Sequence, residues 1–237
     1  MGVTSMTKSA SSEKRTIRLL RWVGYTFLVL ALFDVIEAFI PPIFLNPAWE
    51  FQMQGTLVEH VVLPLLGLIL VFYGEADFRS DWEILLLKII SWSLLVVGFL
   101  YLLLIPLGVS ATFRLYSLSN NQINGQASQK LTQIQQFKEQ LNKASDKDIE
   151  KLLSRVNKGG SPEIKSPEDL KKIKNQLSES STKAESRLKA EAQAAQDIKN
   201  TSLLKNSVKG NLGALVSGIS FLYLWRLTRW VRKFSES

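Results

Sequence analysis

The stretch that decides the fold is residues 84–107, which read ILLLKIISWSLLVVGFLYLLLIPL. A helix needs about 20 largely apolar residues to cross the hydrocarbon core of a bilayer. This stretch meets that length with a single charge, Lys88, close to its start. It therefore predicts a membrane-spanning helix, and we expect that helix to stop near Pro106 because proline removes a backbone donor.

Three other apolar stretches lie on either side of it. The first runs from about 22 to 40, where Pro41-Pro42 stops it, and the second covers 57–74. The last, from 212 to about 231, is interrupted by Arg226 and Arg229, but arginines at a helix end can reach the headgroups. The sequence thus predicts an all-α membrane protein with four transmembrane helices.

The distribution of basic residues gives the predicted orientation. The loop 41–56 has no Lys or Arg, whereas basic residues stand before the first span, in or beside the next short loop, and at the chain end. Cytoplasmic flanks carry the excess of Lys and Arg, so both termini of this multi-pass protein are predicted to be cytoplasmic. The basic residues used here are Lys14, Arg15, Arg18, Arg21, Arg79, Lys88, Arg232 and Lys233.

Residues 117–209 differ from the rest, because they consist mostly of Lys, Glu, Gln, Asn, Ser and Ala. With four spans this segment falls outside the cytoplasm, as an extracytoplasmic, coiled-coil-like helical insert between the third and fourth spans. The predicted domains are a cytoplasmic tail (1–16), a three-span region (17–116), the insert (117–209), and the fourth span with a basic cytoplasmic C-terminus (210–237).

Helical spacing organises the insert around a break at residues 159–162, Gly-Gly-Ser-Pro. Before the break we expect a helix whose inward face is Ala127, Leu131, Ile134, Phe137 or Lys138, and Leu141, followed by a short helix over 149–156. After it, Pro167 is a typical first helical residue. The long helix that follows has an expected apolar face at Leu170, Ile173, Leu177, Ala184, Leu188, Ala195 and Ile198. Its seam also contains Ser181, Glu191 and Ser202, and is therefore too polar for a tight coiled coil. Such a seam indicates a loose helical hairpin, or a helix awaiting a partner.

Several short motifs resemble a known family. They are residues 32–37 (LFDVIE), 40–42 (IPP), 46–52 (NPAWEFQ), 55–68 (GTLVEHVVLPLLGL) and 72–74 (FYG). Together they resemble the HpsJ-like membrane proteins of cyanobacteria, which are associated with hormogonium polysaccharide secretion. The resemblance covers about residues 20–110. It implies a cyanobacterial membrane, plasma or thylakoid, and an accessory role in envelope or polysaccharide export. The family has no established active site whose residues could be matched here.

Ionisable residues at the edges of the spans form the candidate site. In the predicted topology Asp34, Glu37, Glu59 and His60 come together near the outer surface, and Asp34 and Glu37 share a helix face. Such groups often belong to proton relays or ion sites. The alternative is structural: they touch water or pair with Arg114 at the outer end of the third span. We expect no metal site, because one histidine with carboxylates is too common a combination to indicate one.

Small residues recur every four positions along the fourth predicted span, at Gly210, Ala214 and Gly218, with Gly213 and Ser217 in a parallel row. Small side chains at this spacing let two helices approach closely. The stripe predicts packing against the other spans, or against a second copy of the chain.

Composition narrows the function. The chain has no cysteine and one histidine, and it contains no phosphate-binding loop or hydrolase motif, so we expect no enzyme and no cofactor. Its net charge of +8 is not gathered in an aromatic-laced patch, so no nucleic acid is expected. The predicted function is a scaffold or accessory protein of a cyanobacterial membrane assembly, plausibly in polysaccharide export. Expected partners are the bilayer, other membrane proteins or a second copy, and an acidic polysaccharide. The alternative function is a small ion-coupled transporter that uses the acids near the outer face.

Overall fold

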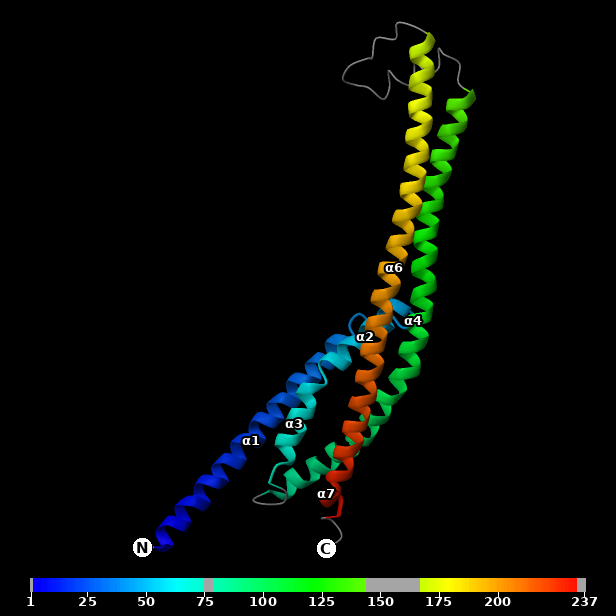
Figure 1. The fold of residues 1–237 in the computed structure, drawn as a ribbon. Coiled ribbons are helices and arrows are strands. Elements are labelled where there is room, and N and C mark those ends of the chain that lie inside the picture. The colour runs from blue at the N-terminus through cyan, green and yellow to red at the C-terminus, as the bar shows by residue number, and fades with distance from the viewer. Residues whose placement is uncertain (1, 75–78, 144–166, 234–237) are drawn as a thin grey trace. The chain divides into compact units, whose positions relative to one another are not determined.

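The computed structural model describes residues 2–74, 79–143 and 167–233, and the regular structure in these ranges is entirely helical (Figure 1). The helices are α1 (Gly2–Ala38), α2 (Pro47–Glu59), α3 (Val62–Phe72), α4 (Asp81–Lys143), α6 (Pro167–Leu227) and α7 (Arg229–Lys233). By length and composition, three helical stretches could cross a membrane: Lys14–Ala38, Pro47–Phe72, and the apolar part of Asp81–Lys143. Within these described ranges the protein is therefore all-helical, with three candidate spans.

The chain divides into two compact units. The first unit comprises Met1–Leu115 with Leu203–Ser237, and the second comprises Tyr116–Ser202. Helices α4 and α6 each supply residues to both units. Which unit lies in or outside a membrane stays a prediction.

The second predicted span is retained as part of the candidate span Pro47–Phe72, but it is interrupted, so the expectation of one continuous helix over 57–74 is wrong. Helix α2 ends at Glu59 and α3 begins at Val62. Pro64 explains the break, because it has no N–H to donate to the His60 carbonyl and its ring crowds that carbonyl. The helix therefore restarts, and Leu63 donates to the His60 carbonyl over a shorter turn at 3.3 Å.

Two other predicted helix ends also differ. Helix α4 continues through Pro106 instead of stopping there. An internal proline is tolerated in an apolar helix that packs against neighbours, because those neighbours stabilise the freed backbone groups. At the other end of the chain, α6 ends at Leu227, before the expected residue 231, and Thr228 separates it from α7.

Glycines set the two closest helix crossings in the first unit. A Cβ built on Gly24 of α1 would lie 2.8 Å from both the carbonyl oxygen of Gly67 and the nitrogen of Val71 in α3. A Cβ on Gly98 of α4 would lie 2.9 Å from Leu222 and 3.3 Å from the carbonyl of Gly218 in α6. Missing side chains thus allow backbone-to-backbone contact, as in membrane helix pairs.

A hydrophobic core joins these helices, and its buried members come from α3, α4 and α6 with Val61. They are Val61, Leu68, Leu94, Tyr101, Ala214 and Phe221.

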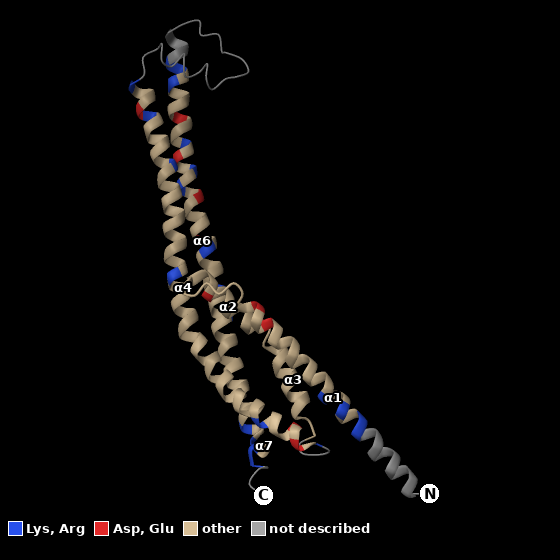
Figure 2. Cartoon of the chain, turned by 180° about the vertical axis from the view of Figure 1, so that it is seen from behind, with Lys and Arg blue, Asp and Glu red and all other residues tan. Residues whose placement is uncertain are grey.

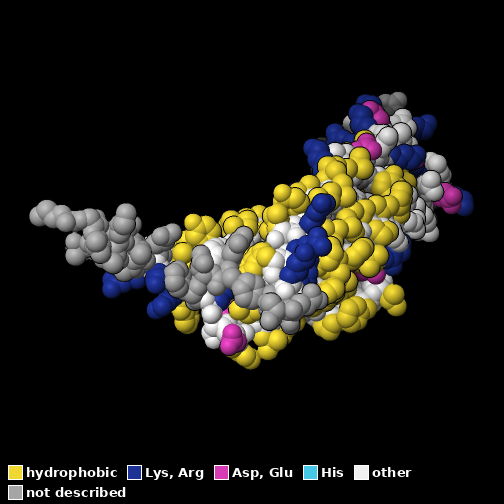
Figure 3. Space-filling view, turned by 90° about the horizontal axis from the view of Figure 1, so that it is seen from below, with side chains coloured by type: hydrophobic (Ala, Val, Ile, Leu, Met, Phe, Trp, Pro, Cys, Tyr) yellow, Lys and Arg dark blue, Asp and Glu magenta, His cyan; other side chains and the backbone are white. Residues whose placement is uncertain are grey.

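Many large apolar side chains nevertheless face outward, as in α4, where Phe113 is 72% exposed. Figure 3 shows hydrophobic side chains over much of the displayed face, and Figure 2 shows that charges are sparse along the middle of α1 and α3. An exterior this apolar suits a lipid environment rather than water.

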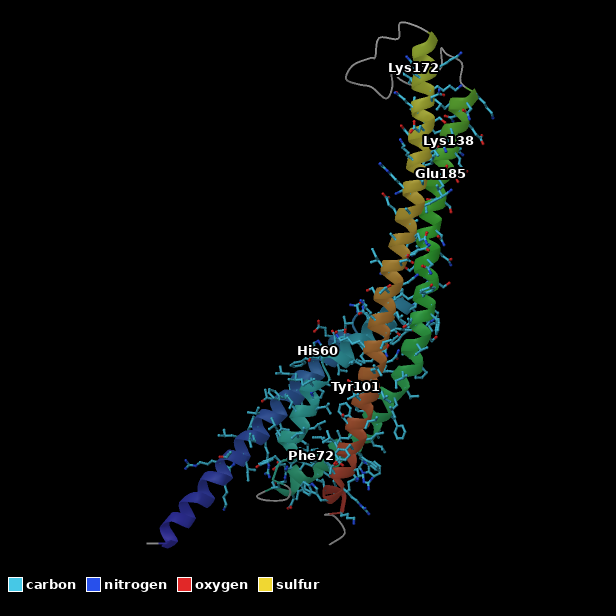
Figure 4. The ribbon with its side chains drawn as sticks, in the orientation of Figure 1. His60, Phe72, Tyr101, Lys138, Lys172 and Glu185 are labelled. Carbon is cyan, nitrogen blue, oxygen red and sulfur yellow. The ribbon has the colours of Figure 1, made fainter. Side chains whose placement is uncertain are left out.

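In the second unit, α4 and α6 run antiparallel. Gln196 Nε2 donates to Asn124 Oδ1 at 2.6 Å, and Lys138 Nζ lies 3.0 Å from Glu185 Oε2 farther along (Figure 4). Hydrogen bonds from Lys189 and Lys138 lower the pKa of the Glu185 carboxyl to about 2. At neutral pH this carboxylate is charged and bridges the two helices.

The inward face of the second unit was predicted correctly for α4 and only partly for α6. Ala127, Leu131, Ile134, Phe137, Lys138 and Leu141 are all shielded. On α6, however, Ala184 and Ala195 are exposed, and Ile198 is 72% exposed. Of the polar seam residues Ser181 is buried, whereas Glu191 and Ser202 are exposed.

The seam of α6 passes instead through polar residues, including Glu185 and Gln196, that bond to α4. A straight helix drifts away from a strict seven-residue repeat, and polar contacts can then replace apolar ones. Pro167 is the first residue of helix α6 in the described ranges, and the predicted start of the helix stays a prediction. The break at 159–162 and the short helix over 149–156 lie outside the described residues.

Candidate functional site

Two of the predicted polar residues meet where α1 approaches the junction of α2 and α3. His60 Nδ1 lies 3.0 Å from Asp34 Oδ2 (Figure 4 labels His60). His60 follows the last residue of α2, and the break before α3 brings its ring towards α1. Glu37 lies one turn beyond Asp34 and is exposed. The structure thus brings Asp34 and His60 together and leaves Glu37 exposed on the next turn of α1.

Glu59 pairs with a residue that the sequence did not single out. Its Oε1 lies 2.7 Å from Lys209 Nζ of α6, and the two side chains are 59% and 69% exposed. They line a pocket of about 410 Å³ together with Asn206 and Gly210. The pair is open to water, so each charge is strongly screened.

Arg114 pairs with Glu50 and not with Asp34, Glu37 or Glu59, so its predicted partner set is wrong. Glu50 lies in the first turn of α2, where its carboxylate is 7% exposed, whereas the Arg114 side chain is 41% exposed. A helix-start signal could have located Glu50. Asn46 caps α2 by accepting from Ala48 N at 2.9 Å, Pro47 follows it, and an acid in the first turn is favoured there.

A chain of partly buried hydrogen bonds starts at Gln54, one helical turn along α2 from Glu50. Gln54 of α2 is 2% exposed, and its Nε2 donates to the Leu104 carbonyl at 3.3 Å and to Asn211 Oδ1 at 3.0 Å. Asn211 Nδ2 donates to Ser207 Oγ at 3.2 Å, and Thr112 Oγ1 donates to the same oxygen at 2.9 Å. The network therefore ties α2 to both α4 and α6. An amide side chain among apolar neighbours was the one sequence signal that could have pointed to Gln54. The sequence does not reveal which groups Gln54 hydrogen-bonds to.

The stripe of small residues on α6 packs within the chain. A Cβ on Gly210 would lie 3.7 Å from the Gln54 amide carbon, and Ala214 is fully buried. A Cβ on Gly218 would lie 2.9 Å from Leu102 of α4, and Gly213 leaves room for Val58 of α2. A Cβ on Gly210 would therefore make only an ordinary contact, whereas the missing side chains of Gly213 and Gly218 allow the close approach of α2 and α4.

Basic side chains dominate the opposite end of the first unit. Arg21 Nε donates to the Tyr73 carbonyl at 3.2 Å, and its Nη2 donates to Gly74 O at 3.1 Å, which caps the end of α3. Arg79 Nη1 donates to Glu83 Oε1 at 2.8 Å and its guanidinium stacks 5.7 Å from the Trp230 ring. The middle of α1, the end of α3, the start of α4 and α7 therefore meet at one end of the unit.

The chemistry available at the polar end is ion pairing and hydrogen bonding. Among the described residues, no group of three or more His, Asp or Glu is placed to hold a metal ion. The carboxylates of Glu50, Glu59 and Asp34 each face a basic group on another helix or at a helix junction. These ion pairs therefore connect α2, and the junction after it, to α1, α4 and α6.

Comparison with known proteins identifies a family. The family model described as "HpsJ-like protein" matches residues 15–229, which is nearly the whole chain. No curated protein and no solved structure gives a significant match.

Proposed function

The chain belongs to the HpsJ-like protein family, and from this premise we propose that it is a non-enzymatic scaffold or accessory protein. It would serve a cyanobacterial membrane assembly that exports polysaccharide. The observation that carries the proposal is the use of buried polar groups. Gln54 hydrogen-bonds to α4 and α6, and Glu50 forms an ion pair with α4. Buried polar groups whose hydrogen bonds are satisfied favour one packing arrangement of the helices. A rigid bundle is what a scaffold requires.

A small ion-coupled transporter is the second candidate, because Asp34 and His60 pair at the edge of the candidate spans. Transport requires acids on the wall of a cavity between helices. The groove of about 680 Å³ between α1, α3 and α4 has a described lining that is apolar apart from Ser93, Tyr101 and backbone atoms. This lining favours the scaffold.

We further propose four spans, with both termini in the cytoplasm and the second unit outside it. Support comes from the first unit itself. Ser91 of α4 lies 2.8 Å from Thr228 at the basic end, and Thr112 lies 2.9 Å from Ser207 at the opposite end, so α6 runs antiparallel to α4. The basic residues gather at the first of these ends, which the positive-inside rule assigns to the cytoplasm.

Reporter fusions test this topology. A reporter after Ser237 is expected to read cytoplasmic, and one inserted at Gly159-Gly160 is expected to read extracytoplasmic, because the Lys- and Arg-poor loop 41–56 must lie on the outer side. The measurement is paired phosphatase and fluorescent-protein activity in whole cells. The same side for both reporters would remove the fourth span and contradict the topology.

The scaffold is tested against the transporter by two variants. Asp34→Asn with Glu37→Gln keeps size and hydrogen-bonding capacity while removing charge. We expect it to lower the free energy of unfolding by at most about 1 kcal/mol and to leave polysaccharide secretion intact, because both acids have access to water. Replacing residues 120–205 with a short flexible linker is expected to abolish secretion while the chain still inserts.

Secretion is measured in cells whose own copy of the gene has been replaced, with protein levels checked by immunoblotting. Loss of secretion in the double variant at normal protein level, together with activity of the shortened chain, would reverse the ranking in favour of the transporter. The two outcomes therefore separate the functions.

The proposed partners are other membrane proteins or a second copy, and an acidic polysaccharide. A groove of about 860 Å³ in the second unit supports the polysaccharide, because Lys130, Lys183 and Arg187 line it with Phe137. Basic side chains beside an aromatic ring can attract anionic sugars. The same variants as above test this role, because the shortened chain lacks the groove.

A further inference from the structure

The basic end of the first unit contains a pocket between α1 and α4 that the scaffold role does not use. Its volume is about 670 Å³, and Lys14, Arg18 and Arg21 of α1 line it opposite Trp82 and Glu83 of α4. Trp22, which also lines it, is 70% exposed, and Trp82 is 72% exposed. Exposed indole rings beside basic side chains are typical of the level of the lipid headgroups.

An apolar groove lies on the same two helices, farther from the basic end. Leu28, Leu32 and Val35 of α1 line it, and so do Ile90 and Val97 of α4. Its volume is about 680 Å³. The surface is open to the outside of the bundle, where acyl chains surround a membrane protein.

The pocket and the groove follow one continuous face of each helix. On α1 the face runs from Arg18 and Arg21 through Tyr25 to Leu28 and Leu32, in steps of three or four residues. Residues at this spacing lie above one another on a helix. On α4 the face runs likewise from Glu83 and Leu86 to Ile90, Leu94 and Val97. One helical turn therefore separates a basic pocket from an apolar groove.

We propose that this surface binds one anionic diacyl membrane lipid, with its headgroup in the pocket and its acyl chains in the groove. Charge and polarity change along the surface in the same order as along such a lipid. Basic pockets between membrane helices on the cytoplasmic side are suited to anionic headgroups. The inference rests on membrane insertion of the first unit and on the proposed cytoplasmic placement of its basic end.

The basic residues of the pocket have different roles. Arg21 is 6% exposed and bonds to the carbonyls of Tyr73 and Gly74, so it shapes the pocket floor and holds α3. Arg18 is exposed on the same helix face, one turn earlier, and its guanidinium can reach a phosphate in two-point contact. Arg18 is therefore the residue that recognises the headgroup.

The test uses the full-length chain in nanodiscs of phosphatidylcholine with added phosphatidylglycerol, and native mass spectrometry counts the lipids retained. Wild type is expected to retain one phosphatidylglycerol in preference to phosphatidylcholine. Arg18→Gln should lower that preference about fivefold, the factor that corresponds to the roughly 1 kcal/mol contributed by one basic side chain near anionic lipid. Arg229→Gln is the matched control, because Arg229 is an exposed arginine at the same end and lies outside the pocket lining.

A second pair of variants tests the groove. Ser93→Leu fills a small, exposed position in its lining and should reduce retention of the anionic lipid, whereas Ser220→Leu on α6 lies outside the lining and should not. Three results would overturn the proposal. The first is equal retention of the two lipids by wild type, and the second is an equal effect of the two arginine variants. The third is occupancy of the surface by a neutral isoprenoid or by a second copy of the chain. The readout is binding and not secretion, so a failed scaffold test leaves it unaffected.

Discussion

Replacing Arg114 with alanine is expected to lower the free energy of unfolding by about 3 kcal/mol, measured in detergent micelles. The change leaves the Glu50 carboxylate 7% exposed without its charged partner. Removing one member of a buried ion pair costs about 3–5 kcal/mol, because the other charge stays in a poorly solvated place. We expect a cost at the lower end of this energy range, because the Arg114 side chain is itself partly exposed. Glu50→Ala should cost less, because the remaining guanidinium can turn towards water.

The matched control is Lys209→Ala, which breaks the Glu59–Lys209 contact between α2 and α6. Both of these side chains are mostly exposed and screened by water, so Lys209→Ala is expected to leave the free energy of unfolding nearly unchanged. If Arg114→Ala and Lys209→Ala have the same effect, the burial of Glu50 does not contribute to stability. Such a result would also weaken the argument that buried polar groups hold the first unit together.

Replacing Gly24 with alanine is expected to separate α1 from α3. The added methyl would lie 2.8 Å from the Gly67 carbonyl oxygen and from the Val71 nitrogen. These are backbone atoms, so no side-chain rotation can relieve the contact, and the helices must move. Overpacking of this kind costs about 1–3 kcal/mol and sometimes more. The measurement is the thermal midpoint in detergent, together with cross-linking between cysteines introduced on α1 and α3.

Gly55→Ala is the matched control, because a Cβ on Gly55 would meet nothing within 4 Å. Gly55 lies inside helix α2, where alanine is favoured over glycine by about 1 kcal/mol. This variant is therefore expected to leave stability unchanged or to raise it. A stable Gly24→Ala protein with unchanged cross-linking would show that α1 and α3 do not cross at Gly24 and Gly67.

The candidate site was partly predictable from the sequence. The meeting of Asp34 with His60 follows from the order of the first two apolar stretches, because adjacent spans joined by a short loop place their facing ends together. The partner of Arg114 did not follow from that order. Glu50 lies in a loop of the predicted topology, and only the folding of residues 47–59 into a helix buries it beside α4.

The sequence by itself determined the helical class, the positions of the apolar stretches and the inward face of residues 127–141. Each depends on local properties, namely hydrophobic length and the helical repeat. The tertiary structure decided the Gln54 network, the crossing of Gly24 with Gly67, and the exposure of Ile198. These depend on how each helix is rotated about its axis against its neighbours. That rotation results from all the packing contacts together, so no single stretch of sequence specifies it.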